Sequence, residues 1–172
     1  PARIVGLACG LPERSNACVV NQNCTSGMRA LEIASRNIMV GATDIALVVG
    51  VENMTQSPYM VPSGRTGARM GDTKMIDSLT HDALIDSLVP GHMGLTAENV
   101  AVMYNITREQ CDELAVRSHQ NAIKATDNGI FKREIVPVEV TTKKGVTIIE
   151  TDEHPIRDCT IESVGKLKPA FK

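Results

Sequence analysis

The chain has 172 residues, a formal net charge of −2 and 42% hydrophobic residues, a composition that is ordinary for globular proteins and excludes disordered and collagen-like classes. It has neither a basic tract nor alternating aromatic and basic residues, so the charge pattern of a nucleic-acid-binding protein is missing. No run approaches the roughly 20 apolar residues that span a bilayer, so we expect no membrane contact and a cytoplasmic location.

The N-terminal third predicts a parallel βαβ unit. We expect a short helix over 2–9, a strand over 17–21, an amphipathic helix over 25–40 and a second strand over 44–51. Gly41 is placed to end the longer helix, and the second strand is apolar from Ile45 onward, as in a strand buried on both faces. Open α/β sheets bind ligands at the carboxyl ends of their strands, so the junction after the first strand is a candidate site.

Cys24 stands at this junction, in the run Asn21-Gln22-Asn23-Cys24-Thr25-Ser26-Gly27. A thiol at a helix N-terminus lies near unpaired backbone N–H groups and the positive end of the helix dipole, and both favour the thiolate. Ser26 and Gly27 leave room for a substrate to approach. The alternative is a small buried hydrophobic residue, which is the commoner role of a free cysteine.

The chain has five cysteines, an odd number without a Cys-x-x-Cys pair, which argues against a disulfide framework and against a zinc site. We expect free thiols in a reducing compartment. Cys9 and Cys111 fall at helical positions and are expected to pack against neighbours.

Residues 54–74 are rich in Ser, Pro, Gly and Arg, which indicates a domain boundary or an interaction arm. Beyond them we expect a helix over 96–104, and Thr107-Arg108-Glu109-Gln110 is a capping box that opens a second helix running to about Asp127, with Gly129 just past its end. A hairpin is predicted from strands over 135–141 and 146–151, where Pro137 suits an edge strand.

Five segments match, in order, the motifs of one family. They are Val20-Asn21-x-x-Cys24-x-Ser26-Gly27, Val49-Gly50-Val51-Glu52-Asn53-Met54, Met93-Gly94-x-Thr96-Ala97-Glu98-Asn99-Val100-Ala101, Gly129-x-Phe131-x-x-Glu134-Ile135-x-Pro137-Val138 and Lys166-Leu167-x-Pro169-Ala170-Phe171. In these segments the chain resembles the thiolases, most closely the biosynthetic acetyl-CoA acetyltransferases. The resemblance implies an α/β fold in which residues 1–54 form part of the N-terminal domain with the nucleophile, and residues 55–172 form an α+β loop domain for CoA binding and oligomerisation.

The resemblance also implies a chemistry. Cys24 would take an acyl group from acyl-CoA as a thioester and pass it to the carbanion of acetyl-CoA, forming acetoacetyl-CoA, or would catalyse the reverse thiolysis. Coenzyme A and acetyl-CoA would be substrates rather than permanently bound cofactors, no metal is implied, and the arm over 55–69 would help to build a homotetramer. The family's Asn-Glu-Ala-Phe and Gly-His-Pro segments and its second reactive cysteine have no counterpart here, so the resemblance implies an internal fragment that is inactive alone.

Six further residues match family positions that contact CoA. Leu84, His92 and Met93 correspond to the pantetheine path, and Arg157, Ser163 and Phe171 fall in segments that hold the ADP end. Arg157 suits an anionic ligand because a guanidinium is always charged and can bind two phosphate oxygens at once. Without the family, Arg157 would be interpreted as a solvated surface charge, and His92 as a helix-start or packing residue.

Two other interpretations stay open. One is a decarboxylating ketosynthase, which also carries a cysteine at a strand-to-helix turn but is loaded from acyl carrier protein. The segment over 93–101 and the inserted loop region favour a thiolase. The other is a non-catalytic CoA-binding or interaction module.

Overall fold

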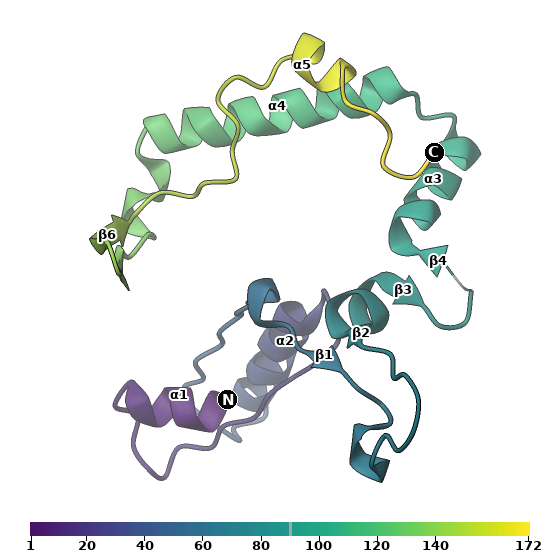
Figure 1. The fold of residues 1–172 in the computed structure, drawn as a ribbon. Helices are drawn as coiled ribbons and strands as arrows, with labels where there is room; N and C mark the ends of the chain where they lie inside the picture. The colour runs from purple at the N-terminus through teal and green to yellow at the C-terminus, as the bar shows by residue number, and fades with distance from the viewer. Residues whose placement is uncertain (90) are drawn as a thin grey trace. The chain divides into compact units, whose positions relative to one another are not determined.

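The fold is described from a computed structural model, for residues 1–89 and 91–172. The chain forms two units, Pro1–Ile85 and Asp86–Lys172, which are described one after the other (Figure 1). Within the described residues, no helix combines the length and the apolar character needed to cross a membrane.

The first unit consists mainly of helices and loops. It contains α1 (Ala2–Ala8), α2 (Ser26–Met39), the 3-10 helices η1 (Met54–Gln56) and η2 (Gly64–Thr66), the π-helix η3 (Leu79–Leu84), and the short antiparallel strands β1 (Tyr59–Met60) and β2 (Ile76–Asp77). The two predicted α-helices are confirmed to within one residue at each end. Gly41 follows α2 with a φ of 70°, a left-handed conformation that glycine adopts without strain, and so ends the helix as predicted.

The strands predicted over 17–21 and 44–51 are wrong for the chain as it stands. Neither segment belongs to a ladder, and an isolated bridge between Gln22 and Cys24 is the nearest pairing. A strand exists only beside a hydrogen-bonded neighbour, and no described segment pairs with either of these. The apolar side chains of the second segment are therefore open to solvent, with Ile45 87% and Val51 89% exposed.

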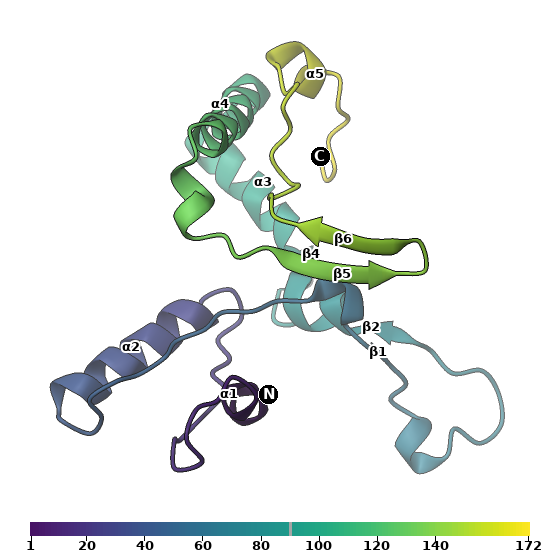
Figure 2. The same cartoon turned by 90° about the vertical axis from the view of Figure 1, so that its left-hand side faces the viewer.

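The second unit is built around one long helix. Its elements are β4 (Gly91–His92), α3 (Met93–Tyr104), α4 (Arg108–Asp127), the 3-10 helix η4 (Ile130–Arg133), β5 (Val138–Thr142), β6 (Gly145–Ile149) and α5 (Ile161–Gly165), while β3 (Ile85–Asp86) lies at the junction of the units. The predicted hairpin is confirmed as β5 and β6, antiparallel in a register from Val138 opposite Ile149 to Thr142 opposite Gly145 (Figure 2).

The capping box predicted at the start of α4 is confirmed. Thr107 Oγ1 accepts a hydrogen bond from the backbone N–H of Gln110 at 3.3 Å, and Gln110 Oε1 accepts one from the backbone N–H of Thr107 at 2.9 Å. Gly129 follows the helix with a φ of 70°. Both ends of α4 are therefore specified by local sequence.

Helix α5 packs along α4 in the second unit (Figure 1). Val116 on α4 is 7% exposed and Cys159, just before α5, is 4% exposed, and these are the buried hydrophobic residues among those described. All five cysteines are free. The expectation that Cys9 and Cys111 pack is wrong, because both are exposed, and the buried thiol is that of Cys159.

Candidate functional site

Cys24 lies on a tight turn that leads into α2. Asn23, the residue before it, has a φ of 48°, a left-handed conformation that asparagine tolerates better than most residues. The backbone N–H groups of Thr25 and Ser26 donate to the carbonyls of Gln22 and Asn23, each at 3.1 Å. Helix α2 begins two residues after Cys24, so the exposed thiol lies at the positive end of the helix dipole.

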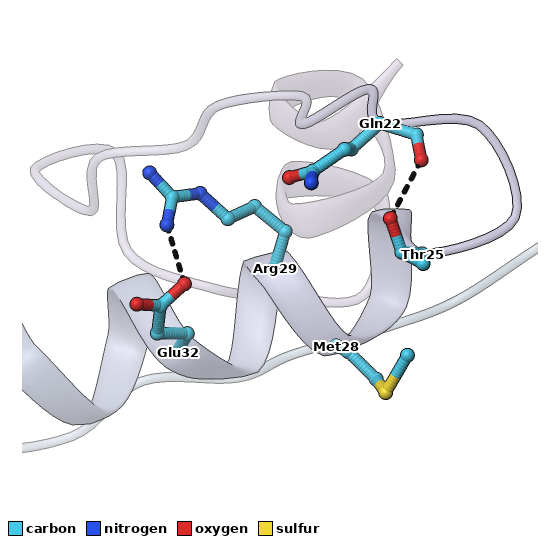
Figure 3. A pocket seen from close by; sticks show the side chains of 5 residues that line it. All are labelled: Gln22, Thr25, Met28, Arg29 and Glu32. Atoms are coloured by element: carbon cyan, nitrogen blue, oxygen red, sulfur yellow. Dashed lines mark hydrogen bonds and ion pairs between the residues drawn. The ribbon is translucent and has the colours of Figure 1, made fainter.

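Two side-chain hydroxyl groups stabilise this turn by hydrogen bonds. Ser26 Oγ accepts from the backbone N–H of Gln22 at 2.8 Å and donates to the carbonyl of Asn23 at 2.7 Å. Thr25 Oγ1 donates to the carbonyl of Gln22 at 2.8 Å (Figure 3). Ser26 was expected to matter for its small size, and the structure shows that its hydroxyl also organises the turn on which Cys24 stands.

A shallow hollow of about 330 Å³ lies next to the turn, lined by Gln22, Thr25, Met28, Arg29 and Glu32 (Figure 3). Arg29 hydrogen-bonds the Glu32 carboxylate, and this bond, with the charges of Arg29 and Arg36, holds the pKa of Glu32 below its ordinary value. The charges in the hollow are thus largely paired, and Cys24 is not among its lining residues.

In the second unit, His92 and Phe171 come together although they are far apart in sequence. Their ring centroids are 4.9 Å apart, at an interplanar angle of 33°. His92 precedes α3 and its Nδ1 accepts a hydrogen bond from the backbone N–H of Gly94 at 3.0 Å, which fixes the ring and leaves Nε2 available. A Cβ on Gly94 would overlap the Phe171 ring, so only glycine leaves room for this contact.

A second hollow, of about 220 Å³, opens beside these rings. His92, Thr96, Asn99 and Lys172 contribute polar groups to its lining. Asp86, also in the lining, accepts hydrogen bonds from the backbone N–H groups of Val89 and Leu88, and these hold its pKa below the ordinary carboxyl value. The hollow therefore offers both donors and a carboxylate to a polar, chain-like ligand.

Arg157 and Ser163 lie on the segment that packs against α4. Arg157 Nη1 donates to Asp127 Oδ2 at 3.0 Å and Nη2 donates to Oδ1 at 2.7 Å. This bidentate pair lowers the pKa of Asp127 and raises that of Arg157. Ser163 belongs to the capping box of α5, in which its Oγ accepts from the N–H of Thr160 at 3.0 Å and donates to the Thr160 carbonyl at 2.9 Å.

All 172 residues match the family described as the N-terminal domain of thiolase. The chain belongs to the thiolase family. The resemblance inferred from five motifs is thereby confirmed, and the exposed thiol of Cys24 lies in a segment that carries one of those motifs.

Two curated relatives illustrate what this thiolase chain is similar to. It is 44% identical, over 173 aligned residues, to a probable acetyl-CoA acyltransferase of Staphylococcus aureus, and 42% identical to an acetyl-CoA acetyltransferase of Pseudomonas aeruginosa. In each case the alignment covers 100% of this chain and 44% of the relative. The thiolase chain therefore spans less than half the length of the curated relatives it matches.

Solved structures confirm the α/β thiolase fold. An acetyl-CoA acetyltransferase from Syntrophomonas wolfei superimposes with a TM-score of 0.94 at 57% identity, over 100% of this chain and 43% of that one. Human mitochondrial 3-ketoacyl-CoA thiolase superimposes with a TM-score of 0.93 at 41% identity, over 99% and 43%.

The thiolase structure brings some of the predicted CoA-contacting residues together. His92 and Phe171 touch, and Met93 follows His92 as the first residue of α3. Leu84 ends η3 in the first unit, where it is half-buried. The assignment of these residues to CoA and of residues 1–54 and 55–172 to separate domains stays a prediction.

Sequence reasoning missed two contacts of the segment that contains Arg157. Asp127 pairs with its guanidinium, and His119 Nδ1 accepts from the backbone N–H of Ile156 at 3.1 Å. Asp127 and His119 both lie on α4, at least 30 residues from the residues they bind, where no spacing rule predicts these contacts. Gly94 was noticed as a place for close approach, and the group that approaches it is the Phe171 ring.

Proposed function

We propose that the whole protein is an acetyl-CoA C-acetyltransferase that joins two acetyl-CoA molecules into acetoacetyl-CoA, and catalyses the reverse thiolysis, through a thioester on Cys24. The observation that carries this proposal is the exposed Cys24 thiol on a tight turn two residues before the start of α2. Membership of the thiolase family and the names of the relatives support it.

The reaction has two steps. The Cys24 thiolate attacks the carbonyl carbon of acetyl-CoA, a carbon–sulfur bond forms, and CoA leaves as a thiolate that takes up a proton. A second acetyl-CoA then loses an α-proton to a base that, by the resemblance, lies outside these 172 residues. Its carbanion attacks the Cys24 thioester, and the Cys24 thiolate leaves as acetoacetyl-CoA forms. By the resemblance, the backbone N–H of Cys24 would donate a hydrogen bond to the oxyanion that forms in each step.

We propose that one group of residues binds the pantetheine end of CoA and another binds the ADP end. By the resemblance, Leu84, His92 and Met93 would contact pantetheine. The ring of His92 and the hollow that it lines provide an apolar face with polar groups beside it. Arg157, Ser163 and Phe171 would meet the ADP end, where the guanidinium of Arg157 complements a phosphate.

The test is acylation of the product of the whole gene. After incubation with acetyl-CoA, intact-mass analysis of the wild type should show the gain of one acetyl group, and peptide mapping should place it on Cys24. Cys24→Ser should show no gain while CoA binding is retained, because a serine hydroxyl lacks the nucleophilicity of a thiolate at neutral pH. Cys18→Ser, which removes another exposed thiol of the same unit, should acylate like the wild type. Acylation of Cys24→Ser would refute the assignment.

The same assay separates the alternatives. A ketosynthase-like condensing enzyme would be acylated from an acyl carrier protein in preference to acetyl-CoA and would decarboxylate its second substrate. A non-catalytic CoA-binding or interaction module would bind CoA without any covalent adduct.

We further propose a homotetramer assembled through the arm over 55–69, in a reducing compartment such as the cytoplasm. The arm exposes Tyr59, and the adjoining Met70 is 100% exposed, so apolar surface is available for another subunit. Light scattering of the whole gene product should give four times the subunit mass, and a smaller assembly would contradict the proposal.

A further inference from the structure

Residues 154–159 are anchored to one stripe of α4 at several points. His119 Nδ1 accepts a hydrogen bond from the backbone N–H of Ile156 at 3.1 Å, and the His119 ring stacks on that of His154 with centroids 6.0 Å apart. Asp127 binds the guanidinium of Arg157. His119 and Asp127 are i and i+8 on the helix, positions that share a stripe. Cys159, 4% exposed, closes the segment by packing inward.

The way Asp127 holds Arg157 leaves part of the guanidinium available. A guanidinium has five N–H donors in a planar fork. Asp127 takes one from Nη1 and one from Nη2, so the Nε–H and one N–H on each terminal nitrogen are not used by this pair. The Arg157 side chain is 62% exposed, and an anion can therefore approach these donors without displacing the carboxylate.

We infer that Asp127 is a positioning residue that, with His119 as the anchor of the adjoining backbone, presents Arg157 to a phosphate of the nucleotide end of CoA. The inference rests on the proposed function, because it takes the ligand of Arg157 from there. A free arginine side chain samples many rotamers and loses that freedom when it binds. Asp127 and His119 impose one arrangement beforehand, which lowers the entropy lost on binding.

A competing effect has the opposite sign. The Asp127 carboxylate repels a phosphate through space, and its removal would strengthen binding if repulsion dominated. Both side chains are more than half exposed, so water and salt weaken this repulsion. The orientation of the guanidinium by Asp127 depends on short hydrogen bonds and is not weakened in this way. Preorganisation is therefore expected to win.

The experiment measures the affinities of the whole gene product for CoA and for pantetheine by calorimetry. Asp127→Ala should weaken CoA binding by about threefold to tenfold and leave pantetheine binding unchanged. In an Arg157→Ala background, Asp127→Ala should have no further effect, because the group it positions is gone. His119→Ala should weaken CoA binding in the same selective way, and Glu113→Ala, which removes another exposed acid from α4, should change neither affinity.

Three results overturn the inference. If Arg157→Ala weakens CoA binding and Asp127→Ala leaves it unchanged or tightens it, Arg157 binds phosphate without positioning by Asp127, and the proposed function stands. If Arg157→Ala leaves CoA binding unchanged, Arg157 does not meet the nucleotide, and the Cys24 acylation assay still decides the activity. An equal loss for CoA and pantetheine in Asp127→Ala would mean a general structural role. Asp127→Asn keeps one acceptor and the fold, and a selective loss smaller than that of Asp127→Ala is expected for it.

Discussion

At the scale of single residues, Asp127 and Arg157 are two exposed charged side chains whose pairing changes the titration of both. Hydrogen bonds from Arg157, helped by its charge, hold the pKa of the Asp127 carboxyl below the ordinary value, although desolvation acts in the opposite direction. Solvent screens such a pair, so its share of the folding free energy is small. Its importance lies in the direction in which it holds the guanidinium.

The first prediction concerns this titration. Arg157→Ala should raise the pKa of Asp127 toward the ordinary carboxyl value. In the wild type the pair stabilises the fold above the pKa of an unfolded aspartate, and this stabilisation is lost as the pH falls through the lower pKa of the folded form. An NMR titration that follows the carboxyl carbon shift of Asp127 measures its pKa in the wild type and in Arg157→Ala. Arg117→Ala, on the same helix, is the control, and equal Asp127 pKa values in wild type and Arg157→Ala would mean that the pair is not formed in solution.

Gly94 carries the second prediction. The Cβ of Gly94→Ala would lie 2.6 Å from Cε1 of Phe171, and still closer to other ring atoms. The ring is the rotatable end of a side chain, so we expect it to swing away from His92 at a stability change below about 1 kcal/mol. Pantetheine binding should weaken, as measured by calorimetry. Gly165→Ala, where no atom lies within 4 Å of the added Cβ, should keep the wild-type affinity. Equal pantetheine affinities in the two variants would show that the paired rings of His92 and Phe171 do not contribute to pantetheine binding.

At the scale of elements, α4 is specified locally and α5 is held by tertiary contacts. Helix α4 has 20 residues and its own capping box, whereas α5 has five residues and is too short to be stable alone. Arg108 joins the two, since it pairs with Asp112 at 2.8 Å and donates to the carbonyls of Val164 and Leu167 at 2.8 and 2.9 Å.

The third prediction tests the cap of α4. Thr107→Ala removes the acceptor for the N–H of Gln110 and should lower the free energy of unfolding by about 1 kcal/mol, as cap removals commonly do. Denaturant unfolding measures the loss. Thr107→Ser keeps the hydroxyl and should remain within a few tenths of a kcal/mol of the wild type. A loss as large in the serine variant would show that the hydroxyl is not what matters.

The fourth prediction tests the attachment of α5. Arg108→Lys keeps the charge but cannot reach the carbonyls of Val164 and Leu167 as a planar fork does, so α5 should open more often. Hydrogen exchange followed by mass spectrometry should then be faster in residues 161–167 and unchanged in the middle of α4. Arg117→Lys is the matched control. Exchange in 161–167 that is the same in both variants would argue against the attachment.

At the scale of the whole molecule, many large apolar side chains of the described residues are exposed to solvent and few are buried. Val116 and Cys159 are the hydrophobic residues that are buried among those described, while Leu31, Val49 and Leu47 are more than half exposed. The segments over 17–21 and 44–51 belong to no strand ladder, although the sequence of each favours a strand.

The fifth prediction follows from this exposure. Residues 1–172 produced alone should bind the dye ANS strongly and associate at micromolar concentrations. Exposed apolar patches favour contact with the dye and with other copies of the chain over contact with water. The whole gene product should bind far less dye under the same conditions. Fluorescence and light scattering measure the two effects. Weak dye binding by the isolated stretch would mean that it covers these side chains itself.

Local order in this chain was readable from the sequence. The capping box at Thr107, the left-handed glycine at 129 and the β5–β6 hairpin depend on groups a few residues apart, so their signals lie within short windows. Five ordered motifs were likewise sufficient to predict the family, and the prediction for Cys24 rests on its own neighbours in the sequence.

Only the tertiary structure decided which distant side chains meet. The pairing of Asp127 with Arg157, the contact of His92 with Phe171 and the burial of Cys159 join residues that no periodicity connects. The predicted strands failed for the same reason, since apolar composition shows that a segment favours a sheet, but the sheet forms only where a neighbouring strand supplies hydrogen bonds. Local preferences act within a turn or two of backbone, whereas these contacts depend on how the elements pack.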